Sequence, residues 1–244
     1  MVMILRSRKA VIKVSVEFHF SEHGTGVRPD IRHFSEYFPG ASFQIHTEAD
    51  MPVMEELNPA HERYGMRRRN YNQIESLLNS RADVAIALDS DMRFYSPYVK
   101  LLPEMARRFG LCMPRNPREM ILVDTRKGVD SDGVVGQDLA GMAVNFSPIA
   151  FHTHDPRARR LLQEALRLMR ANPIRGTLMI PRAEWSLNDP ANPNGLAGVH
   201  AYRLPVQWCV CQENISCGNE IMLHIGHGRV GRSYGMPWNR NPPE

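Results

Sequence analysis

The chain has 244 residues, of which 43% are hydrophobic and 23% are charged, and its formal net charge is +4. This composition indicates an ordinary globular protein, and the sequence contains no internal repeat and no low-complexity segment. No run reaches the roughly 18 apolar residues that a membrane span needs. Residues 1–16 are interrupted by four basic residues and lack a secretory cleavage site. We therefore expect one soluble, cytoplasmic domain over residues 1–244.

The first half of the chain predicts alternating strands and helices, an order that is typical of nucleotide-binding α/β folds. A strand is expected over residues 10–20, where β-branched and apolar residues alternate with polar ones. A helix is expected between Pro29 and Pro39, then a second strand over residues 42–47, and a longer helix that opens at Tyr64.

Three consecutive arginines, Arg67, Arg68 and Arg69, stand near the start of that longer helix. A helix N-terminus already carries partial positive charge, so acidic residues would suit this position better. A bound polyanion would remove the conflict. A basic turn exposed to solvent explains the arginines equally well, because charge runs are usually solvated.

Residues 84–88 are five apolar residues in a row, which is too short for a helix and predicts a strand buried on both faces. Asp89 and Asp91 follow, separated by Ser90. Side chains alternate along an extended chain, so both carboxylates are expected to point the same way at the strand end, where open α/β sheets bind ligands. Two like charges held together favour a divalent cation with oxygen-preferring chemistry.

The second half is expected to complete a mixed sheet with flanking helices. Its predicted elements are a helix from Pro97 to Gly110, a strand over 111–113, a polar loop over 116–137, a strand pair over 141–152, a helix over 157–171, one or two strands within 199–210 and a strand over 221–225.

The cysteines are Cys112, Cys209, Cys211 and Cys217, and a chain of this size does not need disulfides, so we expect reduced thiols. Cys209, Cys211 and Cys217 are close enough in the sequence to suggest a zinc site, but no fourth ligand stands at a familiar spacing. Structural thiols are therefore the better interpretation. The mild positive charge fits an anionic ligand such as a nucleoside diphosphate and permits nucleic acid without requiring it.

Three segments resemble one family. The Leu-Asp-Ser-Asp-Met run at residues 88–92, preceded by a helix beginning with Arg and Tyr, resembles the metal-binding DxD motif of GT-A-fold glycosyltransferases. The Glu-Trp-Ser-Leu-Asn run at residues 184–188 resembles a segment of the retaining glycosyltransferase families 6 and 8. The Leu-His-Ile-Gly-His-Gly run at residues 223–228, with the later Pro237 and Trp238, resembles the ending of family 8. Two departures are Ala183, where family 8 has an acid, and the lack of a lysine before Pro237.

The resemblance implies a GT-A-type α/β fold with a donor-binding half near residues 1–110 and an acceptor and catalytic half near residues 111–244. It implies retaining transfer of a sugar from a nucleotide diphosphate donor to a hydroxyl acceptor, with Mn²⁺ or Mg²⁺ held by Asp89, Asp91 and His224. Glu184 would lie beside the anomeric carbon, either as a nucleophile or as a stabiliser of positive charge.

Further donor contacts are expected at both ends of the nucleotide. Arg67, Arg68, Asp89 and Ser90 would serve the diphosphate and sugar. Ser21, Glu22 and His23 are assigned to the nucleoside only because their loop follows the first strand.

Other readings stand beside these. His224 could be a hydrogen-bonded core histidine, and Glu184 could cap a turn through Asn188 or pair with an arginine. The chain could instead be a nucleotidyltransferase that activates a sugar phosphate, or a non-catalytic relative that binds nucleotide or carbohydrate. The acceptor could be a saccharide, a lipid-linked saccharide or a hydroxylated DNA base, and the sequence does not indicate the oligomeric state.

Overall fold

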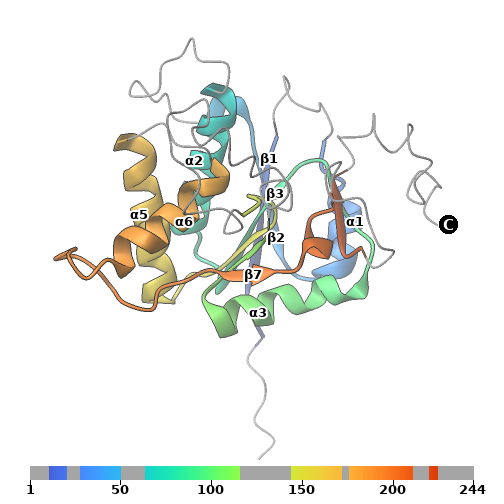
Figure 1. The fold of residues 1–244 in the computed structure, drawn as a ribbon. Coiled ribbons are helices and arrows are strands. Elements are labelled where there is room, and N and C mark those ends of the chain that lie inside the picture. The colour runs from blue at the N-terminus through green and yellow to red at the C-terminus, as the bar shows by residue number, and fades with distance from the viewer. Residues whose placement is uncertain are drawn as a thin grey trace, which may run out of the picture.

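A six-stranded mixed sheet forms the centre of the molecule (Figure 1). The structure is a computed structural model that describes residues 11–20, 28–50, 64–115, 144–171, 176–210 and 220–224. In spatial order the strands are β2 (Ser42–His46), β1 (Val14–His19), β3 (Val84–Asp89), β6 (Ile149–His152), β5 (Leu111–Pro114) and β7 (Tyr202–Leu204). Only β6 runs antiparallel to its neighbours among these strands, so the expected mixed α/β sheet is confirmed.

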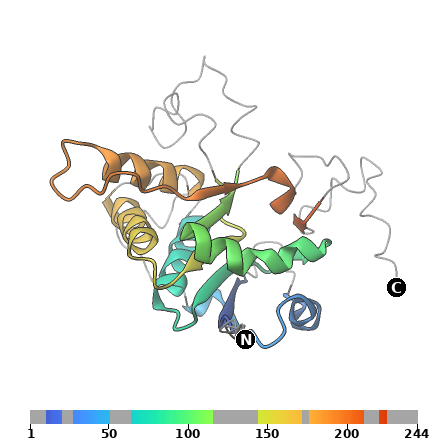
Figure 2. The same ribbon diagram turned by 90° about the horizontal axis from the view of Figure 1, so that it is seen from below.

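Helices cover both faces of the sheet. In Figures 1 and 2, α5 and α6 lie on the opposite side of the sheet from α1. The described helices are α1 (Ile31–Tyr37), α2 (Tyr64–Asn79), α3 (Leu102–Phe109), α5 (Pro156–Ala171) and α6 (Gly176–Asn188), with 3-10 turns at Glu48–Asp50, Pro97–Leu101 and Val206–Trp208.

The central strand β3 separates two hydrophobic cores. Its residues Val84, Ile86 and Leu88 pack into one core with side chains of α1 and α3, whereas Ala85 and Ala87 belong to the other core with α2, α5 and α6. All five are 0% exposed. The prediction of a strand buried on both faces is therefore confirmed, and it follows from the alternation of side chains along a strand.

Several predicted boundaries are wrong where tertiary contacts override the local pattern. The predicted helix from Pro97 is a 3-10 turn that continues into α3. Of the strand pair predicted over residues 141–152, the described part, from residue 144 on, contains one strand, β6, and an isolated bridge at Val144. The sequence analysis assigned no helix to residues 176–188, where α6 accommodates Pro181 in its interior. Proline removes one backbone donor and usually ends a helix, so it masked this element.

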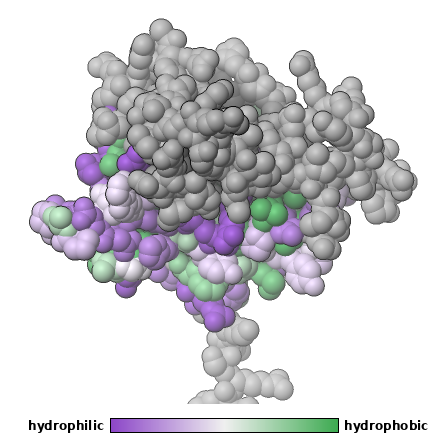
Figure 3. All heavy atoms as spheres, in the orientation of Figure 1, coloured by the Kyte–Doolittle hydropathy of each residue, from purple (hydrophilic) through white to green (hydrophobic). Residues whose placement is uncertain are grey.

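A separate two-stranded sheet joins β4 (Met92–Phe94) to β8 (Met222–His224) in antiparallel register. On the described surface of Figure 3, hydrophilic side chains predominate at the left, over α5 and α6. Arg157, Arg160 and Arg170 of α5 are exposed to solvent. None of the described helices combines the length and the apolar character that crossing a bilayer requires.

Candidate metal and donor site

The carboxyl end of β3 carries the two predicted carboxylates. Asp89 is the last residue of the strand, and Ser90 and Asp91 form a turn that leads directly into β4. The sequence predicted that the two carboxylates share one strand face because side chains alternate. This prediction is wrong, since Asp91 lies in the turn beyond the strand. The carboxylates converge because the chain turns between them, and Asp91 is only 4% exposed.

The β4–β8 pairing brings His224 to this turn. Met92, directly after Asp91, is the register partner of His224, so strand pairing alone places the imidazole beside the carboxylates. His224 Nδ1 lies 3.5 Å from Asp91 Oδ1 and 3.9 Å from Asp89 Oδ2. One ligand atom from each of the three residues lies within 4.8 Å of the other two.

The distances from His224 to the two carboxylates fit one small divalent cation. Two ligands of an ion with bonds of about 2.1 Å can be at most about 4.2 Å apart, and the carboxylate-to-imidazole distances fall within that limit. Burial would lower the pKa of His224, but Cys209, Asp91 and Asp89 outweigh burial and raise its pKa well above the ordinary value. A histidine binds a metal only as the neutral imidazole, so a cation held here would have to displace its proton.

Two neighbouring segments hold Asp89 in place. The Asp89 backbone N–H donates to Ser147 Oγ at 2.9 Å. Gln73 of α2 donates from Nε2 to Asp89 Oδ1 at 3.1 Å and to the Phe146 carbonyl oxygen at 3.3 Å. The strand end is therefore fixed from both the α2 side and the segment that precedes β6.

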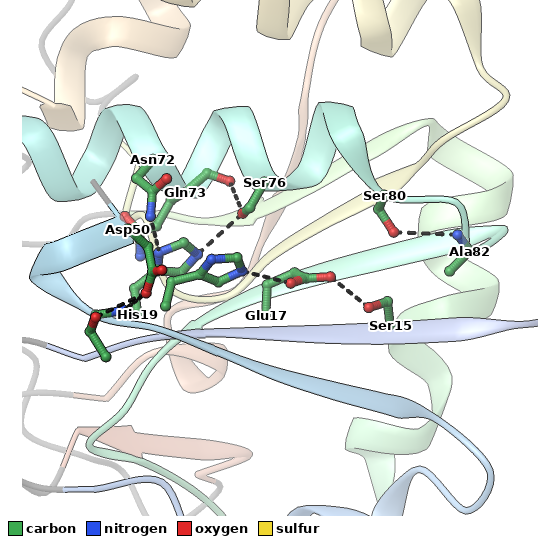
Figure 4. A network of polar contacts seen from close by, with 11 residues as sticks. Ser15, Glu17, His19, Asp50, Asn72, Gln73, Ser76, Ser80 and Ala82 are labelled. Carbon is green, nitrogen blue, oxygen red and sulfur yellow. Dashed lines mark hydrogen bonds and ion pairs between the residues drawn. The ribbon is translucent and has the colours of Figure 1, made fainter. Parts of the chain in front are cut away.

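A buried polar network lies next to this site, between β1 and α2 (Figure 4). His19 pairs in register with His46 on one side and with Asp89 on the other, so the three residues form a row across the carboxyl ends of β2, β1 and β3. The His19 ring stacks on His46 with centroids 4.8 Å apart. Its Nε2 lies 3.2 Å from Ser76 Oγ, and its Nδ1 lies 3.4 Å from Asn72 Nδ2.

Glu17 extends the network along β1. Its carboxylate lies 2.8 Å from His46 Nε2 and accepts a 2.5 Å hydrogen bond from Ser15 Oγ. Ser15, Glu17 and His19 are all 3% exposed or less. Polar residues at alternating positions usually mark a strand face that is exposed to solvent. On β1 this polar face is instead buried, because α2 packs against the strand.

Comparison with known proteins gives a fold but no family. No protein-family model and no curated protein matches the chain. Among solved structures, the apo form of the bifunctional glycosyltransferase WbbM matches 89% of the chain with a TM-score of 0.53 at 13% identity. The fold is of the GT-A type. The chain spans 46% of the length of WbbM.

Two further structures resemble the chain more weakly. The galactosyltransferase LgtC, solved with donor and acceptor sugar analogues, is 10% identical over 86% of both chains, with a TM-score of 0.49. Mouse xyloside xylosyltransferase 1 is 11% identical over 87% of this chain and 97% of its own, with a TM-score of 0.45.

Within the GT-A fold, the structure describes only some of the predicted donor contacts. Ser90 lies in the turn between the two carboxylates and is 4% exposed, and Arg68 is half-buried on α2. The first turn of α2 carries no acidic residue. Burial, then His46 and then Arg69 lower the pKa of His19, so positive charge from α2 also reaches the carboxyl edge of the sheet.

Other predicted residues lie outside the described part of the chain. These are Ser21, Glu22 and His23, the side chain of Arg67, the 116–137 loop, Cys211, Cys217 and the segment that contains Gly226, Pro237 and Trp238. Cys112 and Cys209 are both buried, and neither forms a disulfide among the described residues.

Glu184 is buried in α6 at 2% exposure. Its two carboxylate oxygens accept from the Arg203 guanidinium at 2.8 and 2.6 Å, and Oε1 also accepts from the Ala201 backbone N–H at 2.7 Å. The Asn188 side chain donates to the Glu184 backbone carbonyl. Pairing with an arginine was one of the readings that the sequence left open, and the structure shows that pairing.

Sequence reasoning missed four residues that organise this region: Gln73, Ser147, His19 and Arg203. The alternating polar residues of β1 are visible in the sequence and could have drawn attention to His19. No local pattern identifies Gln73, Ser147 or Arg203, because their partners stand 16 or more positions away along the chain.

Proposed function

We propose that this protein is a metal-dependent retaining glycosyltransferase that moves a sugar from a nucleotide diphosphate donor to a hydroxyl acceptor. The observation that carries the proposal is the convergence of Asp89, Asp91 and His224 at the carboxyl edge of a GT-A-type sheet. Ligands of open α/β sheets bind at this edge. The proposal also assigns the donor half to residues near 1–110 and the acceptor half to residues near 111–244.

The donor set favours Mn²⁺, with Mg²⁺ as the alternative. Two carboxylates and one imidazole mix hard oxygen and borderline nitrogen ligands, which suits Mn²⁺ better than Ca²⁺. Bound there, the ion would supply Lewis-acid stabilisation of the diphosphate that leaves the anomeric carbon.

The residues around the site would bind and orient the donor. Arg67 and Arg68, near the start of α2, would neutralise phosphate charge, which a helix N-terminus also favours. Ser90 would contact the donor from the turn between the carboxylates. Ser21, Glu22 and His23 would contact the nucleoside from the loop that follows β1.

Glu184 is proposed to act beside the anomeric carbon. In the structure Arg203 neutralises its carboxylate, so a role as nucleophile requires that this ion pair opens when donor binds. A role as electrostatic stabiliser requires that Glu184 still attracts the positive charge on the anomeric carbon although Arg203 partly neutralises its carboxylate. A Glu184→Gln variant that binds donor normally and transfers no sugar would support either role, whereas unchanged transfer would remove Glu184 from the mechanism.

A thermal-shift panel tests the proposed function. Nucleoside diphosphates, nucleotide sugars and nucleoside triphosphates are compared in Mn²⁺ and in chelator, for the wild type and for Asp91→Asn. A ligand at 100 times its Kd stabilises the folded state by about 2.7 kcal/mol. We expect one nucleoside diphosphate and its sugar to raise Tm only with metal and only in the wild type.

Two other results would redirect the assignment. Stabilisation by triphosphates alone would favour a nucleotidyltransferase, and metal-dependent binding without turnover would favour a non-catalytic relative. Once the donor is known, transfer to saccharides and to DNA with hydroxylated bases identifies the acceptor class.

A further inference from the structure

We propose that Gln73 is a positioning residue that orients the Asp89 carboxylate for the cation. The inference rests on the proposed function, because it assigns a role to Gln73 only if Asp89 is a metal ligand. Gln73 lies on α2 and is 0% exposed, and its amide nitrogen donates two hydrogen bonds. One goes to Asp89 Oδ1 at 3.1 Å and the other to the Phe146 carbonyl oxygen at 3.3 Å.

The chemistry of its neighbours determines which way the Gln73 amide points. Asp89 Oδ1 and the Phe146 oxygen are both acceptors, so a flipped amide would place its carbonyl oxygen against two other oxygens. Only the observed orientation satisfies both. Asp89 and Phe146 therefore select the donor end of the amide, and the amide in turn fixes the rotation of the carboxylate.

The other end of the amide carries a cost. Gln73 Oε1 is buried and has no hydrogen-bond partner among the described residues. A buried carbonyl oxygen without a partner destabilises the folded state, and an apolar side chain of the same size would avoid that penalty. The position is therefore poorly explained by packing and well explained by the two hydrogen bonds that Nε2 donates.

These contacts fix the orientation of the Asp89 carboxylate. Oδ1 accepts a hydrogen bond from Gln73, and the backbone N–H of Asp89 donates to Ser147. Oδ2 is the oxygen that faces the imidazole, 3.9 Å from His224 Nδ1. Fixing Oδ1 thus presents Oδ2 to the ion together with Asp91 and His224, and such hydrogen bonds to a metal ligand are typically worth 10–100-fold in metal affinity.

The test measures Mn²⁺ binding to the full chain without any substrate. Free Mn²⁺ is followed by its EPR signal during titration of chelator-treated protein, and Tm is measured separately in excess chelator. Gln73→Met keeps the length of the side chain and removes the donor, whereas Gln73→Asn keeps the amide but withdraws it from Asp89. Ser76→Ala is the matched control, because Ser76 lies one turn further along α2 and contacts His19 and the Gln73 backbone oxygen.

We expect both Gln73 variants to bind Mn²⁺ 10–100-fold more weakly than the wild type, and Ser76→Ala to bind it within about twofold. In an Asp89→Ala background, Gln73→Met should cause little further loss, because Gln73 acts on the ion only through the Asp89 carboxylate. If one Gln73 variant does not fold, the other provides the measurement.

Two outcomes would overturn the inference in distinguishable ways. Wild-type affinity in a folded Gln73 variant, or an additive loss in the Asp89→Ala background, removes the positioning role and leaves the proposed function intact. Failure of the wild type to bind any divalent ion overturns the proposed function. It also overturns the role of Gln73, because that role requires Asp89 to be a metal ligand.

Discussion

Single side chains in this protein owe their properties to burial and to one or two charged neighbours. Cys112 lies on β5 within the core, and burial raises the pKa of its thiol to about 12. The thiolate is the reactive form of cysteine, and almost none is present near neutral pH. Cys112 is thus a structural thiol.

We predict that Cys112 stays unmodified when the native protein is treated with a maleimide at pH 7.5. The same reagent should label it fully in guanidinium chloride, where the core is open. Peptide mass spectrometry reports both states, and rapid labelling of Cys112 in the native protein would contradict its inert, buried character.

The Glu184–Arg203 pair yields a second prediction at this scale. The two side chains are 2% and 16% exposed, and breaking a buried pair by removing one partner typically costs about 3–5 kcal/mol. Glu184→Met and Arg203→Met should each lower the free energy of unfolding by that order, measured by chemical denaturation.

The double variant, Glu184→Met with Arg203→Met, provides the control. Replacing both charges leaves neither buried and unpaired, so its stability should recover much of the loss. Equal and additive losses would show that the two side chains act independently of each other.

At the scale of elements, the β1–α2 contact is held by neutral polar groups. Burial first, and then the nearby charges of His46 and Arg69, lower the pKa of His19 well below 6.5 in the folded state. The unfolded chain therefore takes up a proton at a higher pH than the folded protein does. Stability contributed by neutral His19 is present above pH 6.5 and is lost as the pH falls below that value toward the lowered pKa of the folded state.

We predict that the free energy of unfolding falls more steeply between pH 6.5 and pH 5 in the wild type than in His19→Asn. One extra proton bound by the unfolded state corresponds to about 1.4 kcal/mol per pH unit. Urea denaturation across this range measures the two slopes, and parallel slopes would show that His19 does not contribute.

Some elements were predictable because their sequence carries a strong local pattern, either a helical repeat of apolar residues or an uninterrupted apolar run. α2 begins at Tyr64 and β3 begins at Val84, as predicted, and the start of α5 differs by one residue. β4 and α6 were not predicted. β4 is three residues long and exists only by pairing with β8, and α6 contains a proline that its packing against α5 tolerates.

At the scale of the whole molecule, the candidate metal site joins two distant parts of the chain. Asp89 and Asp91 belong to the central region, and His224 belongs to β8, whose described contacts include β4 and the bridge from Val210. An ion bound by all three would tie β8 to the end of β3.

We predict that Mn²⁺ slows amide hydrogen exchange in β8 and leaves exchange in β1 unchanged. β1 pairs on both sides within the central sheet, so its protection does not depend on the ion. Exchange mass spectrometry with and without chelator measures both peptides, and His224→Ala should abolish the effect. Equal exchange of β8 in both conditions would contradict ligation by His224.

The sequence by itself determined the α/β class, the buried central strand and the presence of two carboxylates at its end. These features follow from local periodicity and from an apolar run that stops at Asp89. The resemblance of residues 223–228 to a family motif anticipated that His224 lies with those carboxylates, and the structure places it 3.5 Å from Asp91 and 3.9 Å from Asp89. Only the tertiary structure decided that Gln73 holds Asp89 and that Arg203 pairs with Glu184. These contacts join residues that are separated along the chain and depend on how strands pair and helices pack, which no local pattern records.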